Sequence, residues 1–491
     1  MILVLLAYSE VLQQTVTTDM ITTTAKSGWF VAIASIVLML GLSTMILYSS
    51  PSKASVVPSE NRSRAPHVKM MPVVLIDHTQ EEVWKILCRS LDQYRMESTK
   101  AIQSLGRSLE VALYYESSLE LDISSRLSQK LERRIEKLSA CFDHDFDLLG
   151  KLVVPFEAVR ALPSESSSEN EDQKFKRKDA NKNKIDQSDY LRPPSTIFQV
   201  VHGNSNVKAK NPHHTRSATT TENAYDAMAQ VIAHIARDWS PLGKNIRENI
   251  YQWCVDQVQV HVPMRKEKKI LVPGAGLGRL AFDIANKGYV TEANEISPVM
   301  VAAACAILQR NEAGVLHPFA MDFMNNEVES NRRYDGVHFS TSDDGGLNED
   351  SIPSSPKEKT DEGRLSYTVG DFSYYETKTH HNSFDSVVTC FFIDTAPNIY
   401  DYLNVIANVL PRGGVWVNLG PLQWHRDSIL YPSVDELKDL IVAFGFRIIS
   451  WKIDSEPVSY RDDGYMGGDP SFIRTTNFDA YRPLRFVAIK N

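Results

Sequence analysis

Apolar residues follow two alternating patterns from about residue 225 to the end of the chain. Short apolar runs bounded by glycine, proline or polar residues have the length of buried strands, whereas longer stretches repeat apolar residues at three- and four-residue steps, as helices do. The sequence predicts strands at 269–274, 290–294, 384–392, 414–419, 447–451 and 485–490, and helices at 224–237, 243–260, 280–287, 298–309, 398–410 and 434–444. Strands that alternate with helices predict an α/β fold with a mostly parallel sheet and helices on both faces.

A helical pattern also covers the chain from residue 78 to residue 160. Apolar residues recur there at three- and four-residue steps: Val83, Ile86, Leu87 and Leu91, and later Leu127, Leu131, Ile135 and Leu138. Charged runs such as Glu132-Arg133-Arg134 fit solvated helix faces better than binding patches. We therefore expect an all-helical module ahead of the α/β region.

A membrane-length apolar segment lies near the start of the chain. No charged residue occurs between Lys26 and Lys53, and the run from Trp29 to Tyr48 would extend about 30 Å as a helix. A cleaved signal peptide would have a shorter apolar run, and a buried core helix is seldom apolar on all sides. Residues 28–48 are therefore predicted to be a single transmembrane helix, after an N-terminal tail at 1–27.

Basic residues flank this segment unevenly. Only Lys26 lies before it, whereas four basic residues follow it within about twenty positions: Lys53, Arg62, Arg64 and Lys69. This asymmetry predicts a single-pass membrane protein whose C-terminal portion faces the cytosol. If the segment does not belong to the mature protein, the predicted location is the cytosol or nucleus.

Two stretches of the chain are polar. Residues 161–196 are rich in Ser, Glu, Asn, Lys and Asp, and so few apolar residues cannot bury enough surface to offset the entropy of ordering. A similar stretch at 325–364 interrupts the α/β region. We expect a linker at 49–77, a disordered linker at 161–196, and an α/β domain at 222–491 that carries a surface insertion at 325–364.

Composition narrows the class of partner. The 491 residues leave room for two or three domains at roughly 100–200 residues each. A net charge of −8 provides no basic field for phosphate backbones, so nucleic acid is excluded as the expected partner. Five dispersed cysteines indicate reduced thiols and neither disulfides nor a zinc site. The pairs His213-His214 and His380-His381 lack ligands at metal-binding spacing, so no metal site is predicted.

A glycine-rich turn, Gly274-Ala-Gly-Leu-Gly278, lies between a predicted strand and a predicted helix. Such a turn lets the backbone approach a ligand and offers it helix N-terminal amides. Glu295 follows 295 − 278 = 17 residues later, after the second strand, where a carboxylate can accept hydrogen bonds from ribose hydroxyls. These residues predict an adenosine-containing cofactor. Arg279 occupies the last glycine position of a dinucleotide fingerprint, which favours S-adenosylmethionine while leaving a nicotinamide dinucleotide open.

Several longer motifs resemble the carnosine N-methyltransferase family. They are Val272–Ala281, Gly370–Phe372, Thr389–Ala396 and Asn418–Leu422. The turn Leu410–Gly414 and the closing pair of β runs are also typical of class I methyltransferases. The resemblance is strong from about Tyr225 to the C-terminus and weaker over the helical module. It implies a Rossmann-like class I methyltransferase sheet and S-adenosylmethionine as cofactor.

The resemblance also implies individual cofactor contacts. Together with the glycines of the turn, they fall on His234, Arg237, Gly274, Gly276, Gly278, Glu295, Asp371, Phe372 and Cys390. Arg237 would grip the methionine carboxylate, Asp371 would accept from the adenine amino group, and Phe372 would cover the adenine ring. His234 stands where the family usually has glutamine. Cys390 would contribute either its side chain or only its backbone.

The implied substrate contacts are Asp394, His425, Tyr460 and Tyr481. Asp394 and His425 are the catalytic candidates because both lie just past the carboxyl ends of predicted adjacent strands, where ligands of such sheets bind. Asp394 would accept one ring N–H of an imidazole, so that the other nitrogen is left for attack. His425 would orient the ring or relay the proton, and the tyrosines would hold the polar ends of a dipeptide.

The predicted activity is methylation of the imidazole of carnosine, β-alanyl-histidine, to give anserine, or of a related histidine-containing dipeptide. The alternatives are methylation of a protein histidine or another small amine, and a membrane-tethered protein that binds the cofactor without turnover. A nicotinamide-dependent dehydrogenase fits Arg279 less well. The predicted partners are a small dipeptide and a membrane reached through residues 28–48, and a homodimer is left open.

Overall fold

The computed structural model describes residues 68–119, 126–153, 226–264, 267–321, 329, 331–341, 363–459 and 480–491. Residues from Ala65 onward form one compact unit. The predicted tail at 1–27, the apolar segment at 28–48 and the predicted disordered linker at 161–196 lie outside the described residues.

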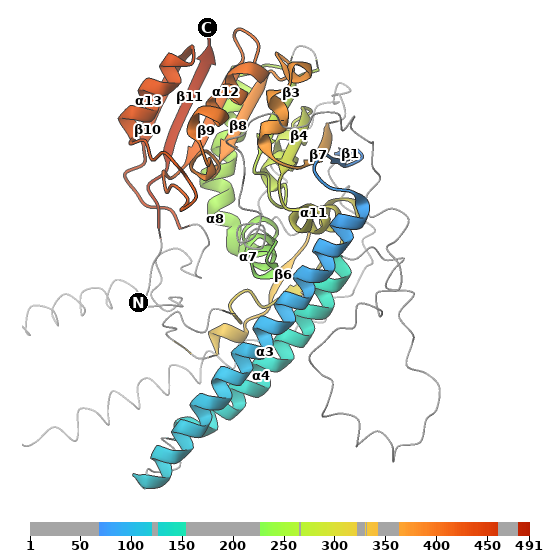
Figure 1. Cartoon of the computed structure of the whole chain (residues 1–491), viewed down its shortest axis with the longest axis vertical. Helices are drawn as coiled ribbons and strands as arrows, with labels where there is room; N and C mark the ends of the chain where they lie inside the picture. The colour runs from blue at the N-terminus through green and yellow to red at the C-terminus, as the bar shows by residue number, and fades with distance from the viewer. Residues whose placement is uncertain are drawn as a thin grey trace, which may run out of the picture. The chain divides into compact units, whose positions relative to one another are not determined.

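The described part of the chain contains a mixed sheet of nine strands (Figure 1). Its seven main strands in chain order are β3 (Lys269–Pro273), β4 (Val290–Glu295), β7 (Arg364–Val369), β8 (Ser386–Cys390), β9 (Val415–Gly420), β10 (Phe446–Ile453) and β11 (Leu484–Lys490). Across the sheet they lie in the order β7-β4-β3-β8-β9-β11-β10. All neighbours from β7 to β9 are parallel, while β11 runs antiparallel to both β9 and β10. The prediction of a mostly parallel sheet is confirmed.

The order of the strands reverses direction at β3. The chain passes from β3 to β4 on one side of it and later enters β8 on its other side, so connections leave the carboxyl end of β3 in opposite directions. In open α/β sheets such a switch point is where ligands bind. The last four residues of β3 and all six of β9 are buried, as expected for strands covered on both faces.

Helices cover both faces of the sheet. Consecutive residues of β3 point to opposite faces: Ile270 and Val272 belong to one core cluster and Leu271 to the other. The first cluster packs against α7 (Met228–Trp239), α9 (Gln252–His261), α10 (Arg279–Ala285) and α11 (Pro298–Arg310). The second packs against α12 (Ile399–Val409) and α13 (Val434–Ala443). The predicted helices on both faces are therefore confirmed.

Two short edge strands extend the sheet beyond β7. β1 (Lys69–Met70) and β2 (Val74–Leu75) each pair with β7 in parallel. Both lie in the range predicted as a linker. A separate two-stranded sheet joins β5 (Gly314–Leu316) to β6 (Val337–Phe339), and β6 lies in the range predicted as a surface insertion.

The N-terminal part of the described chain forms a pair of long helices, α3 (Gln80–Ser118) and α4 (Leu127–Val153), which run side by side in Figure 1. A capping box between Thr79 and Glu82 begins α3. The pair is attached to the α/β part: the carboxylate of Asp145 in α4 accepts hydrogen bonds from the backbone N–H and the Nδ1 of His317.

The predicted membrane localisation was wrong. No helix in the described ranges is long and apolar enough to cross a membrane. The two longest, α3 and α4, are amphipathic, with one buried apolar stripe each and charged residues on their other sides. The segment that prompted the prediction, residues 28–48, is itself outside the described residues.

Candidate functional site

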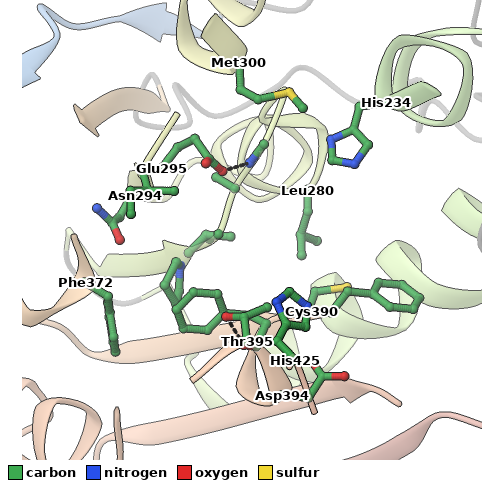
Figure 2. A pocket seen from close by; sticks show the side chains of 18 of the residues that line it. His234, Leu280, Asn294, Glu295, Met300, Phe372, Cys390, Asp394, Thr395 and His425 are labelled. Atoms are coloured by element: carbon green, nitrogen blue, oxygen red, sulfur yellow. Dashed lines mark hydrogen bonds between the residues drawn. The ribbon is translucent and has the colours of Figure 1, made fainter. Parts of the chain in front are cut away.

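A cavity of about 720 Å³ lies over the carboxyl ends of β3, β4, β8 and β9. Its walls come from the β3–α10 turn, the ends of these strands, and helix α7. Of the predicted site residues, the cavity is lined by His234, Arg237, Gly274, Gly276, Glu295, Asp371, Phe372, Cys390, Asp394, His425 and Tyr481. In Figure 2, His234, Met300 and Glu295 lie toward one side of the pocket and Asp394, Thr395 and His425 toward the other.

The glycine turn after β3 brings main chain into the cavity. Gly274 and Gly276 have φ values of +64° and +54°, in the left-handed region that favours glycine. A Cβ at Gly274 would lie 2.4 Å from the Phe392 ring, and one at Gly276 would lie 3.3 Å from His234 Nδ1. Gly278, predicted as a cofactor contact, is not among the residues that line the cavity. It precedes α10 instead, with φ +76°.

Glu295, at the end of β4, fixes the shape of this turn. Its Oε2 accepts a hydrogen bond from the backbone N–H of Gly276 at 2.8 Å, and its Oε1 accepts one from Ser297 at 3.0 Å. Burial raises the pKa of Glu295, although the surrounding backbone N–H groups act to lower it. The carboxylate thus ties the first strand's turn to the second strand at the floor of the cavity.

An aromatic group forms another wall. Phe372 is buried, and its ring meets those of Phe392 and Tyr402 edge-on at centroid distances of 5.2 and 5.1 Å. Phe392 and Tyr402 stack in parallel at 4.8 Å. Next to them, Asp371 Oδ1 accepts from the backbone N–H of Ser373, while the backbone N–H of Asp371 donates to Asp77. The result is an apolar wall with a carboxylate beside it, suited to a flat heteroaromatic ring that carries an amino group.

Helix α7 contributes His234 and Arg237, one helical turn apart. Burial, assisted by the charge of Arg237, lowers the pKa of His234 to about 3, so its imidazole is neutral at physiological pH. Arg237 is 6% exposed, and its Nε donates to Asp238 at 2.6 Å. The cavity therefore has one buried cation close to the glycine turn.

β8 ends in a strained turn that directs side chains into the cavity. Phe391 has a φ of +51°, which is rare for a residue with a side chain. Its backbone N–H donates to the carbonyl of Leu419 in β9, which helps to hold the turn. Cys390 and Phe392, on either side, both line the cavity. Backbone strain of this kind is found preferentially at functional sites.

Asp394 and His425 lie together beyond the ends of β8 and β9. The backbone N–H of Gln423 donates to Asp394 Oδ2 at 2.9 Å, and that of His425 donates to the Asp394 carbonyl at 3.2 Å. Burial raises the pKa of Asp394 to about 6, while the Gln423 N–H and the nearby His425 act to lower it. A carboxylate that is mostly ionised at neutral pH and an imidazole therefore share one wall.

The predicted tyrosines have different outcomes. Tyr481 lines the cavity and is held by a backbone bridge to Val458. Tyr460 lies outside the described residues. A second, more open cavity of about 590 Å³ shares Tyr481, Gln423 and Pro421 with the first, so the site continues outward past β9.

Other cavity residues were not predicted from the sequence. They include Gln230, Asp238, Tyr251, Met300, Thr395, Tyr402, Gln423, Trp424, Arg426 and Asp427. The sequence could have predicted Gln423 as a site residue, because the loop from Pro421 onward follows a predicted strand at the ligand-binding edge of the sheet. Asp238 and Tyr251 could not be predicted in this way, because they meet only through a contact between two helical segments.

Fold and site together define the class of protein. The parallel strands have the order of a Rossmann sheet. The last strand of the chain, β11, is antiparallel and lies between β9 and β10. A glycine turn, an acidic residue at the end of the second strand, and an aromatic wall that follows the third strand, β7, complete the arrangement. This is the architecture of class I methyltransferases, and the cofactor of such a site is S-adenosylmethionine.

The family follows from comparison with known proteins. A family profile described as carnosine N-methyltransferase matches residues 214–491, more than half of the chain. The chain belongs to this family.

Two curated relatives agree with this assignment. The chain is 37% identical over 211 residues to a carnosine N-methyltransferase of Schizosaccharomyces pombe, covering 41% of this chain and 53% of that protein. It is 32% identical over 235 residues to the Rattus norvegicus carnosine N-methyltransferase, covering 45% and 55%. The chain thus spans about half the length of the curated relatives it matches. A solved S-adenosylmethionine-dependent methyltransferase of Methanosarcina mazei shares 15% identity, with a TM-score of 0.28 over 47% of this chain and 96% of that one.

Proposed function

We propose that this protein transfers a methyl group from S-adenosylmethionine to an imidazole nitrogen of carnosine, giving anserine, or of a closely related histidine-containing dipeptide. The observation that carries the proposal is the placement of Asp394 and His425 together in the wall of the cavity, across from His234 and Glu295 (Figure 2). Membership of the carnosine N-methyltransferase family supports the choice of acceptor.

The cofactor side of the cavity has groups suited to each part of S-adenosylmethionine. Glu295 is held at the end of β4, where a ribose would hydrogen-bond to it, and the aromatic wall at Phe372 with Asp371 suits adenine. Arg237 offers a buried cation to the methionine carboxylate. When bound, the cofactor supplies a methyl group on a positively charged sulfur.

Asp394 is the group that we assign to the acceptor's imidazole. A neutral imidazole has one N–H and one nitrogen with a lone pair, and a carboxylate that accepts the N–H selects the tautomer that exposes the other nitrogen. The hydrogen bond from the Gln423 backbone fixes the direction of the Asp394 carboxylate. The same carboxylate would stabilise the imidazolium that forms on methylation.

His425 and the tyrosines complete the acceptor side of the proposal. The backbone N–H of His425 donates to the Asp394 carbonyl, which keeps the two residues side by side. We assign to the His425 ring the task of orienting the acceptor or of receiving the proton that leaves the methylated imidazole. Tyr481, and by resemblance Tyr460, would bind the polar ends of the dipeptide. Holding acceptor and donor in one orientation can lower the activation free energy of the transfer by roughly 7 kcal/mol or more.

Transfer of labelled methyl groups from S-adenosylmethionine to a panel of acceptors tests the proposal. The panel contains carnosine, other histidine dipeptides, free histidine and a histidine-containing protein fragment. We expect label on carnosine or a related dipeptide in preference to the others. Label on none of the dipeptides, by a protein that binds the cofactor, would contradict the proposed acceptor.

The Asp394→Asn variant tests the proposed role of the carboxylate in the same assay. It should bind the cofactor as the wild type does but lose about 100-fold or more in kcat, since the amide cannot accept the N–H as a charged group. Asp385→Asn is the matched control. Asp394 follows the carboxyl end of β8, whereas Asp385 directly precedes the amino end of β8. Asp385 accepts a hydrogen bond from Lys268 and does not line the cavity. Near-wild-type kcat for Asp394→Asn would remove Asp394 from the mechanism.

A further inference from the structure

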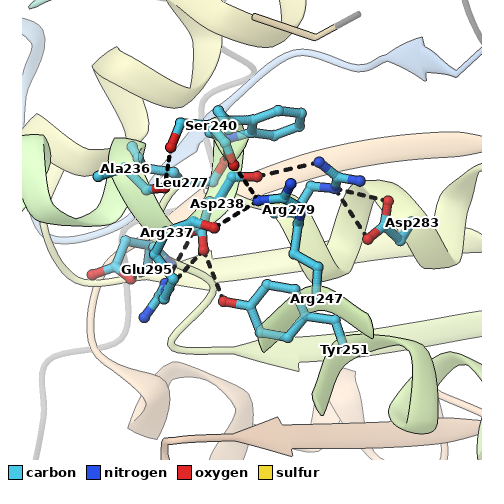
Figure 3. Close-up of polar contacts among 12 residues, drawn as sticks. Ala236, Arg237, Asp238, Ser240, Arg247, Tyr251, Leu277, Arg279, Asp283 and Glu295 are labelled. Atoms are coloured by element: carbon cyan, nitrogen blue, oxygen red, sulfur yellow. Dashed lines mark hydrogen bonds and ion pairs between the residues drawn. The ribbon is translucent and has the colours of Figure 1, made fainter. Parts of the chain in front are cut away.

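Arg237 is held in place by two residues that the sequence motifs do not assign, Asp238 and Tyr251. Arg237 donates from Nε to Asp238 Oδ1 at 2.6 Å and from Nη2 to Asp238 Oδ2 at 3.0 Å. The hydroxyl of Tyr251 donates to Asp238 Oδ1 at 2.8 Å. Figure 3 shows the three side chains converging, and Asp238 is only 1% exposed. The contacts form a buried chain from Tyr251 through the carboxylate to the guanidinium.

The backbone around Arg237 is fixed as well. Tyr251 is the last residue of a π-helical segment, η4 (Arg247–Tyr251), a geometry that is rare and frequent at functional sites. Arg247 opens the same segment and donates from Nη1 to the carbonyls of Arg237 and Ser240, at 2.9 and 2.8 Å. A Cβ at Gly243 would lie 1.5 Å from the Arg237 carbonyl oxygen, so the turn after α7 packs directly on it.

The guanidinium that these contacts orient faces the glycine turn. Arg237, Asp238 and Tyr251 all line the larger cavity. A Cβ placed at Gly276 would lie 4.0 Å from Arg237 Nη2, which puts this nitrogen beside the main chain of the turn. Two fixed N–H groups set the plane of the guanidinium before any ligand arrives, and such preorganisation reduces the entropy that binding must lose.

We propose that Asp238 and Tyr251 are positioning residues that aim Arg237 at the carboxylate of the cofactor's methionine part. Asp238 also makes the burial of the arginine charge affordable, because an unpaired buried cation is strongly destabilising. The hydrogen bond from Tyr251 fixes the Asp238 carboxylate, and this carboxylate in turn fixes the guanidinium of Arg237. This inference rests on the proposed function, and it assigns recognition of one end of the cofactor to a three-residue network.

A comparison of the affinities for two ligands distinguishes this positioning role from a general effect on folding. S-adenosylhomocysteine has the amino-acid end, whereas 5′-methylthioadenosine lacks it and keeps the adenosine. In calorimetric titrations, Asp238→Asn should bind S-adenosylhomocysteine about tenfold or more weakly but 5′-methylthioadenosine within about twofold of the wild type. Tyr251→Phe, which loses one hydrogen bond, should weaken S-adenosylhomocysteine about threefold with the same selectivity.

Asp145→Asn is the matched control, because Asp145 is an equally buried carboxylate that bonds to His317 and not to a cavity residue. It should leave the ratio of the two affinities unchanged. If Asp238→Asn does not fold, the selectivity of Tyr251→Phe between the two ligands tests the proposal by itself. Suppose that the wild type binds S-adenosylhomocysteine more tightly than 5′-methylthioadenosine. Equal losses of affinity for both ligands in the variants, or no loss for either ligand, would then overturn the positioning role. A wild type that binds neither ligand would overturn the proposed function itself.

Discussion

Asp394 and Glu295, two of the carboxylates that line the cavity, have different environments. Both are buried, but Glu295 accepts backbone hydrogen bonds on both oxygens, whereas the backbone N–H of Gln423 holds Asp394 by Oδ2. Glu295 therefore shapes the glycine turn, whereas our proposal gives Asp394 a role with the acceptor. Burial raises the pKa of Asp394 to about 6, close enough to neutrality for its charge to depend on pH.

The titration of Asp394 can be measured directly. In protein labelled with ¹³C at aspartate carboxyl groups, we expect one carboxyl resonance to titrate near pH 6 in the wild type and to be absent from Asp394→Asn. As the pH falls through about 6 the carboxylate gains a proton and can no longer accept the acceptor's N–H, so turnover should fall on the acid side. A resonance of Asp394 that titrates near the ordinary aspartate value of about 3.9 would contradict the assignment.

Single residues were predictable where a motif fixes them to a strand end. Glu295, Asp394 and His425 all lie in the cavity, as their positions after predicted strands suggested. Asp238 and Tyr251 could not be found in this way. Their hydrogen bond joins positions 13 apart through a π-helical segment, and a single sequence carries no signal for that geometry.

At the scale of elements, strands with strong apolar runs were predictable and weak ones were not. β7 (Arg364–Val369) was missed because it begins at the end of the polar insertion, although it lies between β4 and the edge strands. β1 and β2 have two residues each, too few to show a period. Their segment nevertheless reaches the site, where Asp77 accepts from the backbone of Asp371.

The glycine turn gives a prediction about stability. Gly278 has φ +76°, and a Cβ there would lie 1.9 Å from the Tyr367 hydroxyl; Gly413 has φ +80° with nothing within 4 Å of a Cβ. In urea unfolding, Gly413→Ala should lower the free energy of unfolding by about 1 kcal/mol from backbone strain alone. Gly278→Ala should lower it by about 3 kcal/mol, since a steric clash is added. Equal losses would show that contact with Tyr367 does not matter.

At the scale of the whole molecule, the α/β sheet with helices on both faces was predictable because its apolar patterns are regular. The attachment of the long helix pair was not. Apolar residues of both helices pack into the core cluster that also covers one face of the sheet, and polar contacts such as Asp145 with His317 add to this packing. Arg310 also donates to the carbonyls of Lys151 and Leu152 at the end of α4. These contacts join residues far apart in the sequence, so no local pattern predicts them. The limits of a helical module at 78–160 and a methyltransferase domain at 222–491 stay predictions.

The position of the methyl group in the product tests the proposed function most directly. The full chain is incubated with carnosine and S-adenosylmethionine carrying a ¹³C-labelled methyl group, and the product is analysed by NMR and mass spectrometry. We predict one added methyl group on an imidazole nitrogen of the histidine residue, and no labelling of the β-alanine amine. Methylation of the amine, or no methylated dipeptide from protein that binds S-adenosylmethionine, would contradict imidazole methylation as the function of this site.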